Sequence, residues 1–102
     1  MIYSFKHPYS YTSKVVEGWE SNAIGVYYCG YLTTDGKLTI LYIGKGTGEG
    51  GMRKRLLDHL NEDYWPDATH FGFHQCDTAR EAEDHEAAEI KLYKPKYNKL
   101  GK

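Results

Sequence analysis

The chain has 102 residues, of which 40% are hydrophobic and 26% are charged, and its formal net charge at pH 7 is −1. This length corresponds to about one domain and excludes two-lobed cofactor enzymes, and the composition is typical of a globular protein. No apolar run approaches the roughly 20 residues that span a bilayer, and the N-terminus lacks the apolar core of a secretory signal. We therefore expect a cytoplasmic protein without a membrane partner, in which Cys29 and Cys76 remain thiols.

The first 23 residues are rich in aromatic side chains, at Tyr3, Phe5, Tyr9, Tyr11 and Trp19. We interpret residues 1–23 as an arm that packs on a domain formed by residues 24–102, so that the chain is one compact unit. Packing on the sheet is favoured over a role in recognition, because large aromatic side chains are usually buried.

The segments AIGVYYCGYL and KLTILYIG are rich in β-branched and aromatic residues and flank an Asp-Gly turn, which predicts a β-hairpin. A two-residue loop at 35–36 would place Tyr27 opposite Gly44 and Cys29 opposite Tyr42. Tyr27 and Tyr42 would then share one face of the sheet, with Cα atoms about 7–8 Å apart. Two phenols on one face are ordinarily packing residues, but this pair is also close enough to contact one small ligand.

The stretch LYIGKGTGEGGMRKRLLDHL, residues 41–60, runs from a strand through a glycine-rich turn into a predicted helix over 51–60. Arg55 and His59 lie one helical turn apart beside the apolar side, so their donors could converge on one anion. The alternative is a solvated basic helix face. Residues 46–51 also satisfy the Gly-x-Gly-x-x-Gly dinucleotide fingerprint, but an antiparallel hairpin in a short chain disfavours that interpretation, and no Walker A sequence occurs.

The segment THFGFHQC, residues 69–76, alternates as a third strand, with Phe71 and Phe73 on one face. His70 and His74 share the other face, about 13 Å apart along the strand, which is too far for two ligands of one metal ion. We therefore do not assign a zinc site to this pair, and no CxxC pattern is present.

The clearest predicted helix begins at DTAREAEDHEAAEIKLY, where Thr78 and Glu81 form a capping box, and it ends before Pro95. Its packing stripe contains Ala82, Ile90 and Tyr93, and Glu86 falls on the same face. A buried carboxylate needs an Arg, a Lys or a metal ion beside it, whereas a glutamate at the rim of the core reaches solvent. The other acids of this helix, Glu81, Glu83, Asp84 and Glu89, are expected to be solvated.

Several of these segments together resemble the GIY-YIG nuclease domain family. GVY at 25–27 and YIG at 42–44 are similar to the signature tripeptides, and YIGKG, RKRLLDH and HEAAEIKLYKPKYN follow in the family's order across residues 24–99. His59 is similar to the histidine of homing and restriction members. The resemblance implies an α+β fold with a small three-stranded antiparallel sheet flanked by helices. The fourteen residues between Tyr27 and Tyr42 and the expanded glycine turn are departures from the compact family pattern.

The resemblance also implies an endonuclease that hydrolyses phosphodiester bonds in DNA with one Mg²⁺ or Mn²⁺ ion held by Glu86. The implied catalytic residues are Tyr27, Tyr42, Lys45, Arg55, His59 and Asn98, and the implied nucleic-acid contacts are Lys45, Arg53, Lys54 and Arg55. Either Tyr42 or His59 would be the general base. Branched DNA, single-stranded DNA and RNA stay open as substrates, as do a homodimer and a targeting partner. The alternative is a non-catalytic nucleic-acid-binding or protein-interaction module on the same scaffold.

Overall fold

A computed structural model describes residues 1–19, 23–62 and 67–99. In chain order, the elements of this part are β1 (Lys6–Ser10), α1 (Ser13–Gly18), β2 (Gly25–Leu32), β3 (Leu38–Gly46), α2 (Gly51–Glu62), β4 (His70–Gln75), α3 (Ala79–Tyr93) and α4 (Lys96–Lys99). None of the helices within these ranges combines the length and apolar composition of a membrane span.

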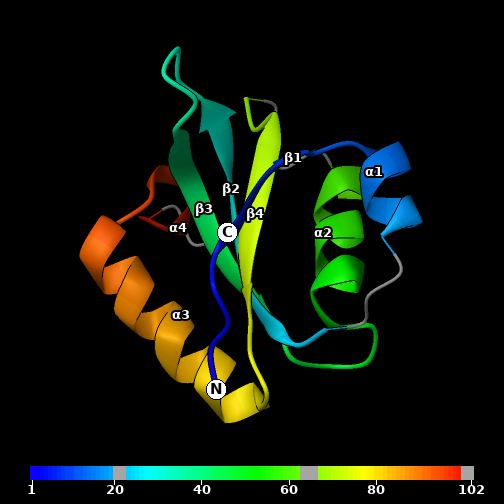
Figure 1. The fold of residues 1–102 in the computed structure, drawn as a ribbon, viewed down its shortest axis with the longest axis vertical. Helices are drawn as coiled ribbons and strands as arrows, with labels where there is room; N and C mark the ends of the chain where they lie inside the picture. Colours follow the sequence, from blue (N-terminus) through cyan, green and yellow to red (C-terminus); the bar gives the residue numbers. More distant parts are fainter. Residues whose placement is uncertain (20–22, 63–66, 100–102) are drawn as a thin grey trace.

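The strands form one antiparallel sheet in the order β1-β4-β2-β3, with α1 and α2 on one face and α3 on the other (Figure 1). The α+β class is therefore confirmed, but the expected three-stranded sheet is wrong because the described sheet has four strands. The extra strand, β1, comes from the N-terminal arm and pairs with β4, placing Tyr9 opposite Phe71. This pairing covers polar backbone groups of β4 that would otherwise lie at an open edge. Pro8 obscures β1 in the sequence, since proline is tolerated in strands mainly at sheet edges.

The β2–β3 hairpin has the predicted pairing near its open end, Tyr27 with Gly44 and Cys29 with Tyr42, but not the predicted turn. The Thr33 N–H donates to the Lys37 carbonyl over 2.8 Å, which leaves a three-residue loop at 34–36. Gly36 has a φ of 83°, a conformation that favours glycine in such a loop. An irregularity between the Cys29 and Gly30 pairs then adds one residue on β3, and this bulge restores the predicted register.

The side chains of the sheet pack into two layers of core. On the α1 and α2 side lie Tyr27, Cys29, Tyr42, Met52, Leu56 and Phe71, and on the α3 side lie Val26, Tyr28, Ile43, Cys76 and Ala82. Strand residues alternate between these layers, as the period of two requires. Cys29 and Cys76 are buried free thiols in different layers.

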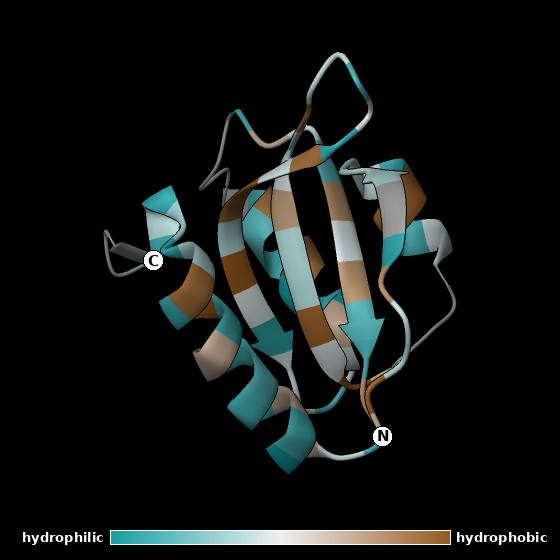
Figure 2. Ribbon diagram, turned by 60° about the vertical axis from the view of Figure 1, so that its left-hand side comes forward, coloured by the Kyte–Doolittle hydropathy of each residue, from teal (hydrophilic) through white to brown (hydrophobic). Residues whose placement is uncertain are grey.

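Helix α3 begins with the predicted capping box, in which the Thr78 hydroxyl accepts from the Glu81 N–H and the Glu81 carboxylate accepts from the Thr78 N–H. Figure 2 shows mainly hydrophilic residues along the outer side of this helix. The expectation of a solvated Glu89 is wrong, because its side chain is only 17% exposed and accepts a hydrogen bond from Tyr28. Tyr93, which was expected to pack, is 53% exposed.

Candidate active site

A polar pocket of about 290 Å³ lies beside the outer strand of the sheet, β3. It is lined by Tyr27, Tyr42, Lys45, Thr47, Gly48, Arg55 and Glu86. These residues come from β2, β3, the glycine-rich turn, α2 and α3. The fold therefore brings together five of the predicted site residues that are distant in the sequence, and sequence reasoning missed the contributions of Thr47 and Gly48.

The two phenols of the pocket lie on the same face of the hairpin, with ring centroids 6.3 Å apart. Gly44 has no side chain, and the two phenol rings occupy the space that a side chain would fill. A Cβ atom at this position would lie 2.4 Å from the Tyr27 hydroxyl oxygen and 2.8 Å from Cε2 of Tyr42, which is closer than packed atoms approach. The glycine of the YIG tripeptide is thus required by the packing of both tyrosines.

Burial raises the pKa of both phenols above the ordinary tyrosine value. For Tyr42, the nearby Glu86 carboxylate raises the pKa further, and Arg55 lowers it only in part. For Tyr27, the influence of Arg55 is also smaller than that of burial. In this state of the molecule, both phenols are neutral hydrogen-bonding groups at neutral pH.

His59 is buried against Tyr27. Its side chain is 5% exposed, its Nε2 atom is 3.0 Å from the Tyr27 hydroxyl, and it is not among the residues that line the pocket. Arg55 does line the pocket and has Nη1 3.7 Å from the Asp58 carboxylate. His59 therefore adjoins the pocket through Tyr27, and the convergence of Arg55 and His59 on one anion stays a prediction.

Glu86 faces the same pocket and is paired with a cation, as a half-buried carboxylate requires. Its side chain is 18% exposed, and Oε1 is 3.4 Å from Nζ of Lys45. A single carboxylate in an open polar pocket fits a hard divalent cation such as Mg²⁺, which needs few protein oxygens because it keeps several of its waters.

Asn98, from α4, binds the backbone of the strand that carries Tyr42. Its Oδ1 accepts from the Ile43 N–H over 2.8 Å, and its Nδ2 donates to the Ile43 carbonyl over 2.9 Å. These bonds satisfy two outward-facing groups of the edge strand β3. Asn98 is thus placed as a brace of the pocket wall, outside the lining itself.

Arg53 and Lys54 lie outside the polar pocket. Arg53 donates to the Glu17 carbonyl over 2.9 Å, and Lys54 has Nζ 3.4 Å from the Asp58 carboxylate. Both line a neighbouring groove along α2 that also includes Glu49. Of the four predicted nucleic-acid contacts, the structure therefore places two in the pocket and two beside it.

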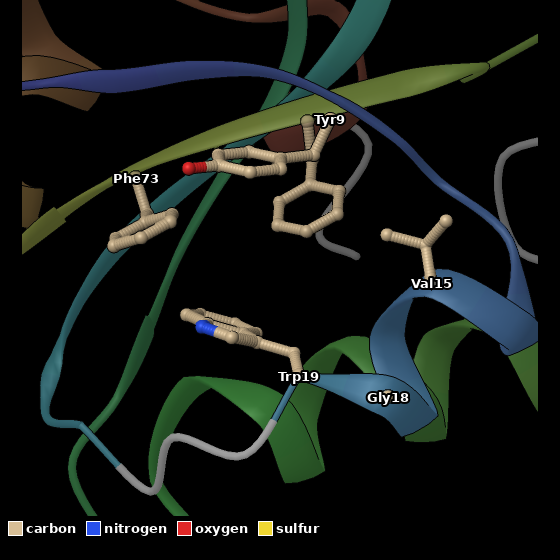
Figure 3. A pocket seen from close by; sticks show the side chains of 6 residues that line it. Tyr9, Val15, Gly18, Trp19 and Phe73 are labelled. Atoms are coloured by element: carbon tan, nitrogen blue, oxygen red, sulfur yellow. The ribbon is translucent and has the colours of Figure 1, made fainter.

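A second cavity, of about 190 Å³, lies between β1, α1 and β4 and is almost entirely apolar. Figure 3 shows Tyr9, Trp19 and Phe73 around it. Tyr9 stacks on Phe71 and Phe73 at centroid distances of 5.5 and 5.8 Å, and Trp19 lies 4.8 Å from Phe73. This lining has no charged group for phosphate chemistry, so we assign the candidate active site to the polar pocket.

Sequence reasoning also missed that His74, His85 and Glu89 lie close enough together to hold a metal ion. His74 lies on β4, whereas His85 and Glu89 lie on α3, so the three side chains meet only when this helix packs on the sheet. Comparison of the chain with family models, curated proteins and solved structures found no match.

Proposed function

We propose that the chain is a divalent-metal-dependent endonuclease of the GIY-YIG type, which hydrolyses phosphodiester bonds in DNA. The observation that carries the proposal is the convergence of Tyr27, Tyr42, Arg55 and Glu86 on one polar pocket. These are the residues that the motif resemblance selects, and they come from four different elements. Phosphodiester hydrolysis needs an activated water, stabilisation of phosphate charge and help for the leaving oxygen, and the pocket has a group for each.

Arg55 and Lys45 provide the positive charge for phosphate binding. Arg55 is half exposed at the pocket, so its guanidinium can donate to phosphate oxygens as negative charge builds on them. Lys45 is 38% exposed on its flexible stem and would exchange its contact with Glu86 for one with the phosphate.

Water activation is best explained by Tyr27 and His59 acting in sequence. The attacking water would transfer its proton to the Tyr27 oxygen while the phenolic proton passes to Nε2 of His59, 3.0 Å away. This transfer avoids a free phenolate, which burial disfavours. Of the two candidate bases, the arrangement favours His59, acting through Tyr27, and leaves Tyr42 to orient the water.

Glu86 would hold Mg²⁺ or Mn²⁺, with waters completing the coordination. When bound, such an ion would neutralise charge on the scissile phosphate and on the leaving oxygen. Glu86 itself would hold that charge in the pocket that the two tyrosines also line.

The test is cleavage of supercoiled, linear, single-stranded and branched DNA, and of RNA, in Mg²⁺, Mn²⁺ or EDTA. Glu86→Gln and Arg55→Ala are expected to lower the metal-dependent rate by about 100-fold or more. The matched controls are Glu83→Gln, which is exposed on α3, and Arg80→Ala, whose Nε is 3.7 Å from Asp84 just as Arg55 is 3.7 Å from Asp58. Circular dichroism checks that each variant is folded.

Each outcome bears on the proposal. Metal-dependent cleavage that is lost in Glu86→Gln and Arg55→Ala but kept in both controls supports the nuclease. Equal cleavage by the wild type and Glu86→Gln would assign the activity to a contaminant or to another site. Nucleic-acid binding without cleavage of any substrate would favour the non-catalytic binding module.

A further inference from the structure

The sheet has a second group of chemically active side chains on the face opposite Tyr27. His74 on β4 and His85 and Glu89 on α3 each offer one ligand atom, and these three atoms lie within 4.8 Å of one another. All three residues are partly buried where α3 packs against the sheet, and Figure 1 shows this helix across the sheet from α2. We propose that His74, His85 and Glu89 bind a Zn²⁺ ion that fixes α3 to the sheet.

The spacing on α3 supplies two of the ligands. His85 and Glu89 are one helical turn apart and therefore project from the same side of the helix. His85 Nε2 and Glu89 Oε1 are 3.4 Å apart. Ligand atoms of a tetrahedral zinc ion with bonds of about 2.0–2.2 Å lie roughly 3.3 Å from each other, so this pair already has the required separation.

The third ligand, His74, is held in a suitable tautomer. Its Nδ1 atom lies 2.7 Å from the carbonyl oxygen of Tyr3. Because a carbonyl oxygen only accepts, Nδ1 is the protonated nitrogen, and Nε2 keeps its lone pair for a cation. A histidine that donates its other ring N–H to a carbonyl is the usual arrangement of a zinc ligand.

The Glu89 carboxylate is oriented by a hydrogen bond from Tyr28. The Tyr28 hydroxyl donates to Oε1 of Glu89 over 2.7 Å and also lies 3.3 Å from Nε2 of His85. Each of His74 and Glu89 therefore has a supporting hydrogen bond, which is a feature of built metal sites.

The donor set selects the class of ion. Two imidazole nitrogens and one carboxylate oxygen suit Zn²⁺ and neighbouring first-row divalent ions, whereas Mg²⁺ and Ca²⁺ prefer oxygen ligands. Three protein ligands leave a fourth position for water. A cavity of about 260 Å³ lined in part by Tyr28, His74 and Glu89 provides room for it.

The zinc site is separate from the carboxylate of the proposed nuclease, although His85 and Glu86 are neighbours in the chain. Successive residues of a helix point about 100° apart. Accordingly, Glu86 contacts Lys45 of β3 at the polar pocket, whereas His85 contacts Tyr28 of β2. The zinc proposal therefore does not depend on nuclease activity.

The experiment is a titration of the purified, tag-free protein with ZnCl₂ by calorimetry, together with thermal unfolding with and without the ion. We expect one ion per chain and a higher unfolding temperature in its presence. His85→Ala and Glu89→Gln should each weaken zinc affinity about tenfold or more. Glu89→Gln keeps an oxygen that can accept from Tyr28, so it remains informative if His85→Ala does not fold.

The controls are His70→Ala, at the far end of β4, and Glu83→Gln, which is exposed on α3, and neither should change the zinc affinity. Absence of zinc binding by the wild type would overturn the proposal. Equal affinity in the wild type and in Glu89→Gln would also overturn it, because the ion would then bind elsewhere. A loss of binding in Glu86→Gln with retention in Glu89→Gln would move the ion to the polar pocket.

Discussion

At the scale of single residues, the polar pocket depends on how closely Tyr27 is held. Its hydroxyl lies against His59 on one side and above Gly44 on another, in a position that a side chain at residue 44 would occupy. Its ring is 1% exposed, so it cannot move aside into solvent without losing its packing.

Gly44→Ala is therefore expected to displace the Tyr27 hydroxyl and lower the cleavage rate about tenfold or more, with DNA affinity little changed. Overpacking of this kind should also cost about 1–3 kcal/mol in the free energy of unfolding. Gly18→Ala is the control, because a Cβ atom there meets nothing within 4 Å. Single-turnover kinetics and urea unfolding measure the two effects, and a fully active Gly44→Ala variant would show that the position of Tyr27 is not critical.

The raised pKa of Tyr27 also predicts how stability responds to alkaline pH. The ordinary tyrosine value is 10.0, and the folded value lies above it, so the folded state holds its phenolic proton more tightly than the unfolded state. The contribution to stability is complete below about pH 10 and is lost as pH rises through the folded pKa. Urea unfolding between about pH 8 and 11 should show this fall, and Tyr27→Phe should make it shallower. The control Tyr31→Phe, at a residue that is 41% exposed, should leave the profile unchanged.

At the scale of elements, the site is built on the edge strand β3, and Asn98 forms hydrogen bonds with the backbone of this strand at Ile43. Asn98→Ala removes both side-chain bonds to Ile43 and should cost about 1–3 kcal/mol, since two backbone groups of a partly buried strand lose their partners. Hydrogen exchange at the Ile43 amide should accelerate, because opening of this strand becomes easier. Asn98→Asp keeps an acceptor for that amide and should show the smaller change. Equal exchange in the wild type and Asn98→Ala would mean that the brace is not needed.

The hairpin shows what could be predicted from the sequence and what could not. The alternation of β2 and β3 was enough to place Tyr27 and Tyr42 on one face of the sheet, because hydrophobic pattern restricts register strongly. The pairing of Tyr27 with Gly44 was predicted from a two-residue loop. It is observed because the bulge on β3 offsets the extra residue of the three-residue loop, and neither of these two features was predicted. Strand β1 was missed because its sequence, KHPYS, has little strand character, and its pairing with β4 is a distant contact.

The same limit applies to side chains that meet across layers. Helical spacing predicted that Glu86 lies on the packed side of α3, and the resemblance placed it with Tyr42 and Arg55. The environment of Glu89 was not predictable from α3 alone, because its hydrogen-bond donor, Tyr28, comes from β2. The contact of His59 with Tyr27 was likewise not predictable from α2 alone, because Tyr27 comes from β2.

At the scale of the whole molecule, the net charge of −1 hides a local arrangement that suits a nucleic acid. Lys45 and Arg55 line the polar pocket, Arg53 and Lys54 line the groove along α2, and Asp58 of this groove pairs with both Arg55 and Lys54. A DNA backbone bound at the pocket would therefore cross this helix, with Lys54 as an outer contact.

Lys54→Gln tests this path, because the side chain is 59% exposed and forms an ion pair with Asp58 on the same helix. Each phosphate contact contributes about −0.9 to the slope of log affinity against log salt on duplex DNA. We therefore expect Lys54→Gln to make the slope shallower by about that amount and to weaken binding to different sequences equally. Lys37→Gln in the hairpin loop, where the side chain is 83% exposed, is the matched control and should leave the slope unchanged. If the two variants shift the slope equally, the contact is general surface charge and the path does not follow α2.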